Sequence, residues 1–248
     1  MLLHRQLALV TGAARGMGAS MAQGLAAAGA DVVVTDLDAQ GAQRTAAAIR
    51  RAGGTAHALA LDVTDPAQCA AVADATGAWG GLSILVNNAG VRPRHAFDSA
   101  DRDLQWRRAM DVNLDGVRHM TLACLAALSA NRGSVINITS ITAFQASPMS
   151  LAYSTSKAAA AMLTKVLALE LAPRGVRVNA IAPGVIATEM TAAARQDPAR
   201  SQYLMGRIPM GRYGQPGDLV GPAVFLASSM SSYMTGAVLN VDGGYLAA

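Results

Sequence analysis

Short runs of β-branched and aliphatic residues alternate with Ala-rich segments of helical length along all 248 residues. Strands that are joined by helices in this way form right-handed crossovers, which build a parallel sheet covered by helices on both faces. The alternation therefore predicts an α/β fold with a doubly wound parallel sheet of about seven strands. We expect the strands at residues 7–10, 32–35, 56–61, 82–87, 134–139, 176–181 and 238–241. We expect the helices at residues 16–28, 39–52, 66–79, 101–130, 151–172 and 216–228.

The composition gives no reason to divide the chain. Hydrophobic residues make up 52% and charged residues 15%, which excludes a disordered polymer and permits a large core. No linker rich in Pro, Gly or Ser and no repeat of fixed period interrupts the chain, so we expect one domain over residues 1–248. Residues 188–209, which include Pro198, form a polar insertion after a predicted strand. We expect this insertion to be a substrate lid, with an ordinary surface loop as the alternative.

Charge and cysteine usage narrow the range of partners. The 20 basic and 16 acidic residues give a net charge of +4, and the basic residues form no run, which does not favour nucleic-acid binding. Cys69 and Cys124 lack the spacing of zinc ligands and the four histidines are scattered, so we expect no metal. The most hydrophobic stretch contains Lys165 and Glu170, and the N-terminus lacks the pattern of a secretory signal. We therefore expect a cytoplasmic protein with no membrane partner.

Three glycines, Gly12, Gly16 and Gly18, lie between the first predicted strand and the first predicted helix. Glycine is needed where the backbone turns with positive φ, approaches a pyrophosphate closely and lets a helix and a strand touch. The start of the helix adds unpaired N–H groups and a partial positive charge. We therefore predict that this turn binds a dinucleotide, with Arg15 and Met17 among the contacts.

Asp36 bears on the choice between the two nicotinamide dinucleotides. It ends the second predicted strand, where a carboxylate accepts hydrogen bonds from the ribose hydroxyls and repels a 2′-phosphate. Leu37 follows at a position where an NADP-binding protein often has a cation. Arg15 argues for NADP, because a guanidinium in the glycine turn is within reach of that phosphate, but it is also free to turn into solvent. We expect NAD as the cofactor, with NADP as the weaker alternative.

The ends of the third and fourth predicted strands supply further cofactor contacts. The carboxylate of Asp62 is suited to an adenine amino group and Val63 to packing on the ring. The alternative role for Asp62, capping the next helix, suits Asp65 better. Small residues and amides after the fourth strand let the cofactor pass closely, with a plain turn as the alternative. These residues are Asn88, Ala89 and Gly90 of the sequence NNAG at 87–90.

Tyr153 and Lys157 are spaced to project from one face of a helix. A tyrosine is mostly protonated at neutral pH and a nearby ammonium favours its phenolate, so this pair is suited to moving a proton to or from an alcohol oxygen. Ser140 ends the fifth predicted strand at the same edge of the sheet, where its hydroxyl polarises the same oxygen. Asn113 is suited to holding a water that relays protons to Lys157. Each residue alone has an ordinary structural role, but together they predict a catalytic site.

With these motifs the sequence resembles the short-chain dehydrogenase/reductase family over nearly its whole length. The resemblance rests on the glycine turn, the NNAG segment and the residues Asp62, Asn113, Ser140, Tyr153 and Lys157. It implies a Rossmann-like fold, hydride transfer with a nicotinamide cofactor that Tyr153 and Lys157 also contact, and a homotetramer. The tetramer would be built from the helices containing Asn113 and Tyr153 and from the C-terminal helix and strand. The resemblance further implies cofactor contacts at Pro183, Gly184, Ile186 and Thr188.

The substrate is expected to contact the loops that follow the strands. The candidate residues are Arg92, Thr142, Gln145, Ser147, Met149, Val185 and Met190. Most of them are neutral. We expect Arg92, Arg94 and His95 to be solvated charges at the rim, with binding of an anion as the alternative. We therefore expect an NAD-dependent dehydrogenase that interconverts a neutral secondary alcohol, including a polyol or cyclic alcohol, and its ketone. The alternatives are an NADPH-dependent 3-oxoacyl-carrier-protein-type reductase and a non-catalytic dinucleotide-binding protein.

Overall fold

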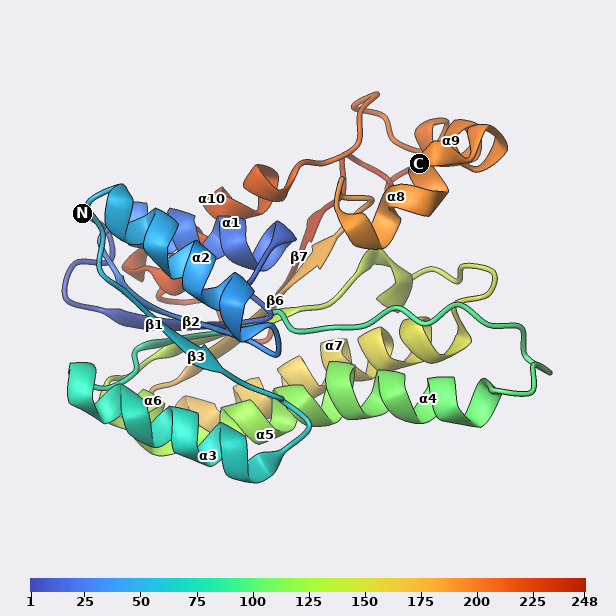
Figure 1. Cartoon of the computed structure of the whole chain (residues 1–248). Coiled ribbons are helices and arrows are strands. Elements are labelled where there is room, and N and C mark those ends of the chain that lie inside the picture. The colour runs from blue at the N-terminus through green and yellow to red at the C-terminus, as the bar shows by residue number, and fades with distance from the viewer.

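The computed structural model describes all 248 residues, and its centre is one parallel sheet (Figure 1). The strand order is β3-β2-β1-β4-β5-β6-β7, and every neighbouring pair is parallel. The fold predicted from the alternation is confirmed. The strands are β1 (Leu7–Thr11), β2 (Asp31–Asp36), β3 (Ala56–Ala60), β4 (Ile84–Asn87), β5 (Ser134–Ile138), β6 (Arg177–Pro183) and β7 (Val238–Val241).

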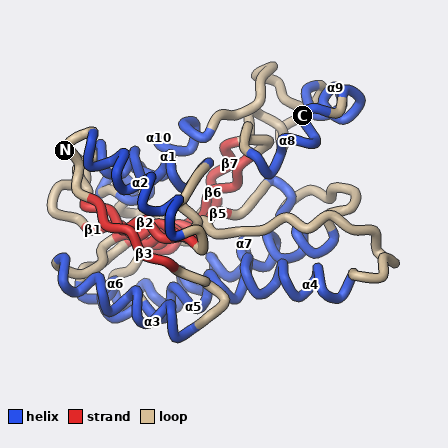
Figure 2. The backbone as a smooth tube through the Cα atoms, viewed as in Figure 1, coloured by secondary structure: helices blue, strands red, loops and turns tan.

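Helices cover both faces of the sheet, so that Figure 2 shows the strands between two helical layers. One layer holds α1 (Gly16–Ala27), α2 (Ala39–Arg51) and α10 (Val220–Ala227). The other holds α3 (Pro66–Ala75), α4 (Arg102–Met110), α5 (Gly116–Ala123), α6 (Leu125–Ala130) and α7 (Leu151–Leu171). Two short helices, α8 (Glu189–Gln196) and α9 (Pro198–Met205), lie outside both layers near the C-terminus. None of the helices combines the length and the hydrophobicity that crossing a membrane requires.

Alternation along the central strands fills two separate cores. In β1, Ala8 and Val10 belong to the core under α1, α2 and α10, whereas Leu7 and Leu9 belong to the core on the opposite face. All five residues of β1 are buried, because a parallel strand covered on both faces has no solvent side. The near-continuous apolar strands in the sequence follow from this burial.

Two segments differ from the sequence expectation. The long helix predicted at 101–130 is interrupted by a wide π-helical turn at Asp111–Asp115. It is interrupted again at Cys124, between the end of α5 and the start of α6. The lid, which was expected as a polar insertion, contains α8 and α9, and these two helices meet at Asp197. Asp197 caps α9 by accepting a hydrogen bond from Arg200 N at 2.8 Å. Local capping thus makes the insertion helical.

The strand order places a crossover point beside the carboxyl end of β1. The chain runs outward from β1 through β2 to β3 and then returns to the other side of β1 as β4. Loops after β1 and β4 therefore leave in opposite directions and open a crevice, which is where ligands bind in doubly wound sheets. The glycine turn follows β1 and the NNAG segment ends β4, so both predicted motifs lie at this crevice.

Candidate active site

The glycine turn is packed too tightly for side chains at two of its positions. Gly12 has φ +63°, and a Cβ there would lie 2.7 Å from Ala89 Cα. A Cβ on Gly18 would overlap the carbonyl oxygen of Gly12. No side chain caps the start of α1, so its first N–H groups face the crevice without a partner from a capping side chain. This arrangement fits a pyrophosphate approaching the backbone.

Asn88 joins the glycine turn to the end of β4. Its Nδ2 donates to Thr11 O and to Gly12 O, both at 2.9 Å. The hydroxyl of Thr11 in turn accepts hydrogen bonds from Asn88 N and Ala89 N, each at 3.0 Å. The two motifs that the sequence separates by more than seventy residues are therefore held together by four hydrogen bonds.

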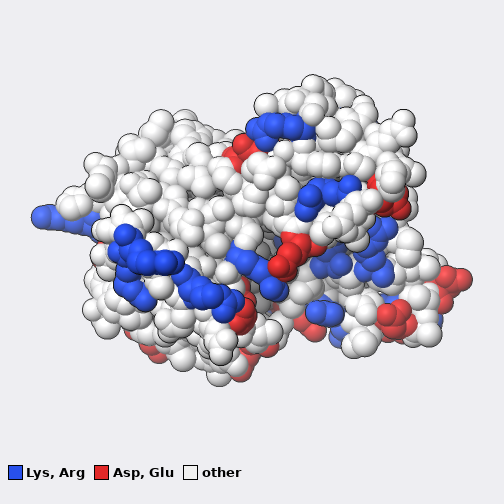
Figure 3. All heavy atoms as spheres, turned by 45° about the horizontal axis from the view of Figure 1, so that its top comes forward, with Lys and Arg blue, Asp and Glu red and all other residues white.

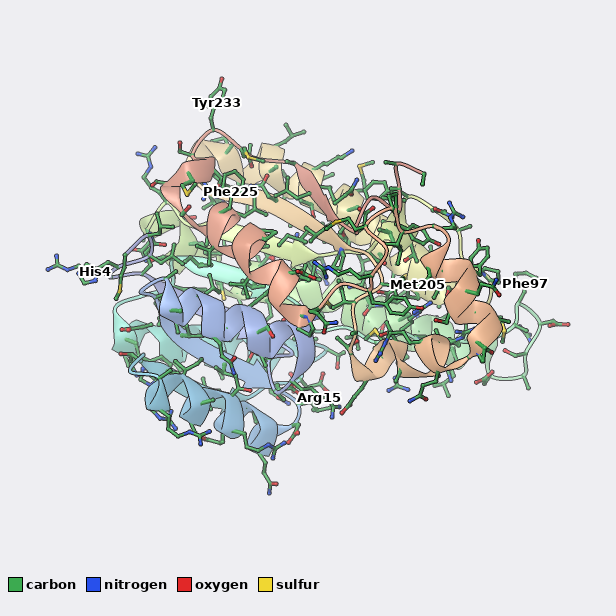
Figure 4. The ribbon with its side chains drawn as sticks, turned by 90° about the horizontal axis from the view of Figure 1, so that it is seen from above. His4, Arg15, Phe97, Met205, Phe225 and Tyr233 are labelled. Atoms are coloured by element: carbon green, nitrogen blue, oxygen red, sulfur yellow. The ribbon has the colours of Figure 1, made fainter.

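Asp36 lies at the end of β2 and holds the next turn in place. One carboxylate oxygen accepts from Ala14 N and the other from Asp38 N, both at 2.9 Å. Arg15 forms an ion pair with Glu189 at 3.3 Å, and both side chains are more than two-thirds exposed. Figure 4 shows Arg15 at the start of α1, next to the lid. Arg15 is thus in solvent, as the sequence reasoning allowed.

One hollow runs along the glycine turn, and we call it the glycine-turn hollow. Its lining contains twelve of the predicted cofactor residues, from the ends of four strands: Gly12, Arg15, Gly16, Met17, Gly18, Asp36, Leu37, Asp62, Val63, Asn88, Ala89 and Gly90. Thr188 is the thirteenth predicted cofactor residue in this lining. Sequence reasoning missed Leu61, Val91, Val112 and Glu189 there, because no motif marks them. Asp65, and not Asp62, caps α3.

The long helix α7 presents Tyr153 and Lys157 one turn apart, close to the end of β5. Tyr153 is 9% exposed, Lys157 4% and Ser140 7%. Lys157 Nζ donates to Ile138 O at 2.8 Å and lies 5.9 Å from the centre of the Tyr153 ring. Ser140 accepts a hydrogen bond from Thr142 N at 3.1 Å, which fixes the start of the following loop. The structure therefore brings the pair chosen on one helix close to Ser140, which was chosen from a separate segment.

Asn113 lies in the π-helical turn and is completely buried. Its side chain donates to Val91 O and Ser156 Oγ and accepts from Val91 N, all at 2.9 Å. A Cβ on Gly90 would lie 3.2 Å from Asn113 Oδ1 and 3.4 Å from Lys157 Nζ. Asn113 therefore joins the loop after β4 to α7 beside Lys157, and protein groups occupy the hydrogen bonds of its side chain.

The charges at the site act on Tyr153 in opposite directions. Burial raises the pKa of the Tyr153 phenol, while the neighbouring Ser140 hydroxyl and the Arg92 cation lower it. Burial also lowers the pKa of Lys157, to about 8. The Arg92 guanidinium carbon lies over the Tyr153 ring, 5.5 Å from its centre. Sequence reasoning assigned the cation that favours the phenolate to Lys157 alone and missed Arg92 in this role.

A second hollow adjoins the first and contains Tyr153 and Ser140; we call it the tyrosine hollow. Six of the seven predicted substrate residues line it: Arg92, Thr142, Gln145, Ser147, Val185 and Met190. Pro183, Gly184, Ile186 and Thr188 line it as well. Met149 is half exposed and lies outside this lining, so the structure does not place it with the other six.

The lid closes one side of the tyrosine hollow. Leu204 and Ile208 pack with Ile141 and Tyr245 in a small core of their own. Leu204, Arg200 and Tyr245 line the hollow, and none of them was predicted from the sequence. Arg200 and Leu204 come from α9 and Tyr245 from the segment after β7, and the sequence carries no local signal for the packing that brings these segments together.

The two hollows share Met17, Thr188 and Met190, so they form one continuous crevice. No group of three or more His, Cys, Asp or Glu side chains is placed to hold a metal ion. A doubly wound sheet with a glycine turn at its crossover point, next to a buried tyrosine and lysine, is typical of dinucleotide-dependent α/β oxidoreductases.

Comparison with known proteins agrees with this class. A family described as enoyl-(acyl carrier protein) reductase matches residues 12–246. The chain is 40% identical to galactitol 2-dehydrogenase (L-tagatose-forming) of Cereibacter sphaeroides, over 96% of this chain and 94% of that protein. It is 39% identical to 2-dehydro-3-deoxy-D-gluconate 5-dehydrogenase of Dickeya dadantii, over 99% and 97%.

The fold matches solved structures equally well. A gluconate 5-dehydrogenase from Burkholderia cenocepacia J2315, solved in complex with NADP and tartrate, superposes with a TM-score of 0.95. It is 40% identical and covers 99% of this chain and 97% of its own. The chain belongs to the short-chain dehydrogenase/reductase family.

Proposed function

We propose that this oxidoreductase interconverts a secondary alcohol and its ketone, with hydride transfer to or from NAD. The observation that carries the proposal is the position of Tyr153 and Ser140 in the tyrosine hollow, which is continuous with the glycine-turn hollow. A reacting carbon beside Tyr153 is then within the same crevice as the end of a dinucleotide seated on the glycine turn. The relatives support an alcohol as the substrate, because galactitol and deoxygluconate derivatives both carry secondary hydroxyls.

The residues present fit a dinucleotide. The cradle formed by Gly12, Gly18 and Asn88 leaves no space for a Cβ at either glycine, and the start of α1 is open to an anion. Pro183, Gly184, Ile186 and Thr188 would hold the nicotinamide end. The bound cofactor supplies the acceptor or donor of the hydride.

The protein's own residues handle the proton. In oxidation the alcohol gives its O–H proton to the Tyr153 phenolate as its C=O bond forms, and the bound cofactor would accept the hydride that leaves the same carbon. Ser140 donates a hydrogen bond to the substrate oxygen and holds it beside Tyr153. Lys157 and Asn113 lie behind Tyr153, where they position the cofactor and the loop after β4. Reduction runs through the same steps in reverse.

Replacement of Tyr153 tests this mechanism. We expect Tyr153→Phe to lower kcat by about 10² to 10⁴-fold, because proton transfer is lost while the ring is kept. The measurement is nicotinamide absorbance across a panel of polyols, cyclic alcohols and hydroxy acids, together with dinucleotide binding by fluorescence. Binding should be unchanged. Full activity of the variant would refute the assignment of the proton to Tyr153.

Asp36 supports NAD over NADP. Its carboxylate is fixed by Ala14 N and Asp38 N at the end of β2, where it faces the glycine-turn hollow. A 2′-phosphate there would meet a fixed negative charge. We expect kcat/KM to favour NAD by at least about tenfold, and Asp36→Asn to reduce that preference. An equal or greater kcat/KM with NADP would contradict the proposal.

NADP is the second candidate, and it is favoured by two observations. The similar Burkholderia gluconate 5-dehydrogenase was solved with NADP. Arg15 is exposed at the glycine turn, and its partner Glu189 is also in solvent, so the ion pair costs little to break. An NADPH-dependent reductase of the 3-oxoacyl-carrier-protein type would use Arg15 for the 2′-phosphate. In that case Arg15→Ala would selectively raise the KM for NADP.

We also propose that the protein is a cytoplasmic homotetramer. The helices that the family resemblance assigns to the tetramer carry exposed apolar side chains, including Leu122 on α5 and Leu169 on α7. The two cysteines are unpaired and buried, which suits a reducing compartment.

A further inference from the structure

Two arginines from different elements line the tyrosine hollow. Arg92 comes from the loop after β4, and Arg200 comes from α9 in the lid. The lining of this hollow comprises 21 residues and contains no aspartate or glutamate. Figure 3 shows basic side chains spread over this face of the molecule with acidic side chains between them, whereas the lining of the hollow has basic ones alone. The hollow that contains Tyr153 is therefore positively charged.

Both arginines are partly buried, and neither guanidinium has an acidic partner. The Nε atoms of Arg92 and Arg200 are both buried and without a hydrogen-bond partner. Neither side chain forms an ion pair. Arg200 Nη2 donates to Ser147 Oγ at 3.3 Å, and its guanidinium carbon lies 5.1 Å from the centre of the Tyr203 ring, while Arg92 lies over the Tyr153 ring. Unpaired buried N–H donors are rare in folded proteins, because leaving one unsatisfied costs about 1–3 kcal/mol.

The two charges also repel each other. Burial lowers the pKa of the Arg92 guanidinium, and the nearby cations of Arg94 and Arg200 lower it further, while Tyr153 has the opposite effect. An arginine remains charged at any ordinary pH, so this unfavourable field persists in the empty hollow. An anion placed between Arg92 and Arg200 would supply hydrogen-bond acceptors for their N–H groups and a negative charge that offsets the repulsion between the two cations.

The phosphates of the cofactor are not that anion. The pyrophosphate belongs at the start of α1, in the glycine-turn hollow, and Arg15 is the arginine that lines this hollow. Arg92 and Arg200 line only the tyrosine hollow, together with Ser140 and Tyr153. The anion must therefore belong to the molecule that reacts at Tyr153.

We propose that the substrate is a hydroxy acid, and that its carboxylate is held between Arg92 and Arg200 while its hydroxyl lies at Tyr153 and Ser140. This inference rests on the proposed function and specifies its substrate class. Two forked guanidinium groups suit the two oxygens of a carboxylate. The carboxylate would also join the lid to the loop after β4, so binding would close the hollow. This substrate class differs from the neutral alcohol expected from the sequence, since Arg92 lies over Tyr153 and the lid contributes Arg200.

The test compares each hydroxy acid with the neutral alcohol of the same skeleton. The pairs are D-gluconate with D-glucitol, D-galactonate with galactitol, and 4-hydroxycyclohexanecarboxylate with 4-(hydroxymethyl)cyclohexanol. Binding to the protein saturated with reduced dinucleotide is measured by calorimetry, because the reduced cofactor cannot accept a hydride from the alcohol. We expect at least one acid to bind about 10- to 100-fold more tightly than its neutral partner, as charge-assisted hydrogen bonds suggest.

Arg200→Gln is the decisive variant, because Arg200 does not contact Tyr153. We expect it to abolish the preference for the acid and to leave binding of the neutral partner within about twofold. Arg94→Gln is the matched control: it removes the same charge from an exposed side chain outside the hollow. It should keep the preference. A general loosening of the lid by Arg200→Gln would instead weaken the acid and the neutral alcohol alike.

Two results would overturn the proposal. One is that no acid binds more tightly than its neutral partner, and the other is that the preference survives in Arg200→Gln. These results are independent of turnover, so they are distinguishable from a failure of the proposed function, which full activity of Tyr153→Phe would reveal.

Discussion

Lys157 is 4% exposed, and its ammonium has one hydrogen bond, to Ile138 O, and no carboxylate partner. Burial lowers its pKa from 10.5 to about 8. Below pH 8 Lys157 is therefore charged in both the folded and the unfolded chain, and its charge is less favourable in the folded protein. Between pH 8 and 10.5 the folded protein releases this proton first, so its stability relative to the unfolded chain rises with pH across that window. Lys157 is thus retained at a cost in stability, as expected of a residue kept for chemistry.

Lys157→Met should therefore separate stability from activity. We expect the variant to lose turnover and to gain about 1–3 kcal/mol in its free energy of unfolding at pH 7, with the gain shrinking between pH 8 and 10. Urea unfolding at pH 7 and pH 9.5 measures both values. Lys165→Met is the control, because Lys165 is the only other lysine and lies exposed on the same helix, α7. A variant that is less stable than the wild type at both pH values would contradict the prediction.

At the scale of elements, the sequence predicts the strands from their repeated apolar runs, but it does not predict an irregular turn that depends on a distant contact. The strands were placed within about two residues, because burial on both faces leaves apolar runs such as Ala8 to Val10. The interruption at Asp111–Asp115 was missed, since it follows from the burial of Asn113 against Val91 and Ser156. No periodicity signals such a distant contact.

In the candidate site, too, some residues could be predicted from the sequence and others could not. Motif residues such as Tyr153 and Gly12 could be chosen from spacing, because their neighbours are fixed by the sheet. Arg200 could not be chosen, because its position depends on how the lid packs through Leu204 and Ile208. Met149 lies in the expected loop but is half exposed and outside the lining of the hollow, which its position in the sequence does not reveal.

The cap of α9 gives a prediction at this scale. Asp197 accepts from Arg200 N, and Pro198 follows at the first position of the helix. We expect Asp197→Ala to weaken α9 by about 1 kcal/mol, to raise the KM for substrate several-fold and to increase hydrogen exchange within residues 188–209. The reason is that α9 carries Arg200 and Leu204 into the tyrosine hollow.

Asp65→Ala is its matched control. Asp65 caps α3 by accepting from Ala67 N and Gln68 N, and it too is followed by a proline. It should lower global stability by a similar amount and leave KM unchanged, because α3 does not line the tyrosine hollow. Equal effects of the two variants on KM would show that the lid has no special part in binding.

At the scale of the whole molecule, α7 connects the site to the protein surface. Its inner side buries Tyr153 and Lys157, whereas Met162, Val166 and Leu169 on the same helix are between 42% and 79% exposed. These three are spaced to lie along one side of the helix. A row of exposed apolar side chains on the helix that carries the site is typical of an interface between subunits. Assembly would then hold α7, and with it Tyr153, in a fixed position.

Charge on this row should therefore break the proposed homotetramer. We expect Met162→Glu combined with Leu169→Glu to give a smaller species in size-exclusion chromatography with light scattering, because two carboxylates would be buried without partners in the interface. Activity should fall with the loss of assembly, since α7 is no longer supported from outside. Leu2→Glu is the control: it places the same charge on a residue that is 54% exposed, near the N-terminus and away from α7. A wild-type protein that elutes as a monomer, or a double variant that remains a tetramer, would show that this face of α7 is not the interface.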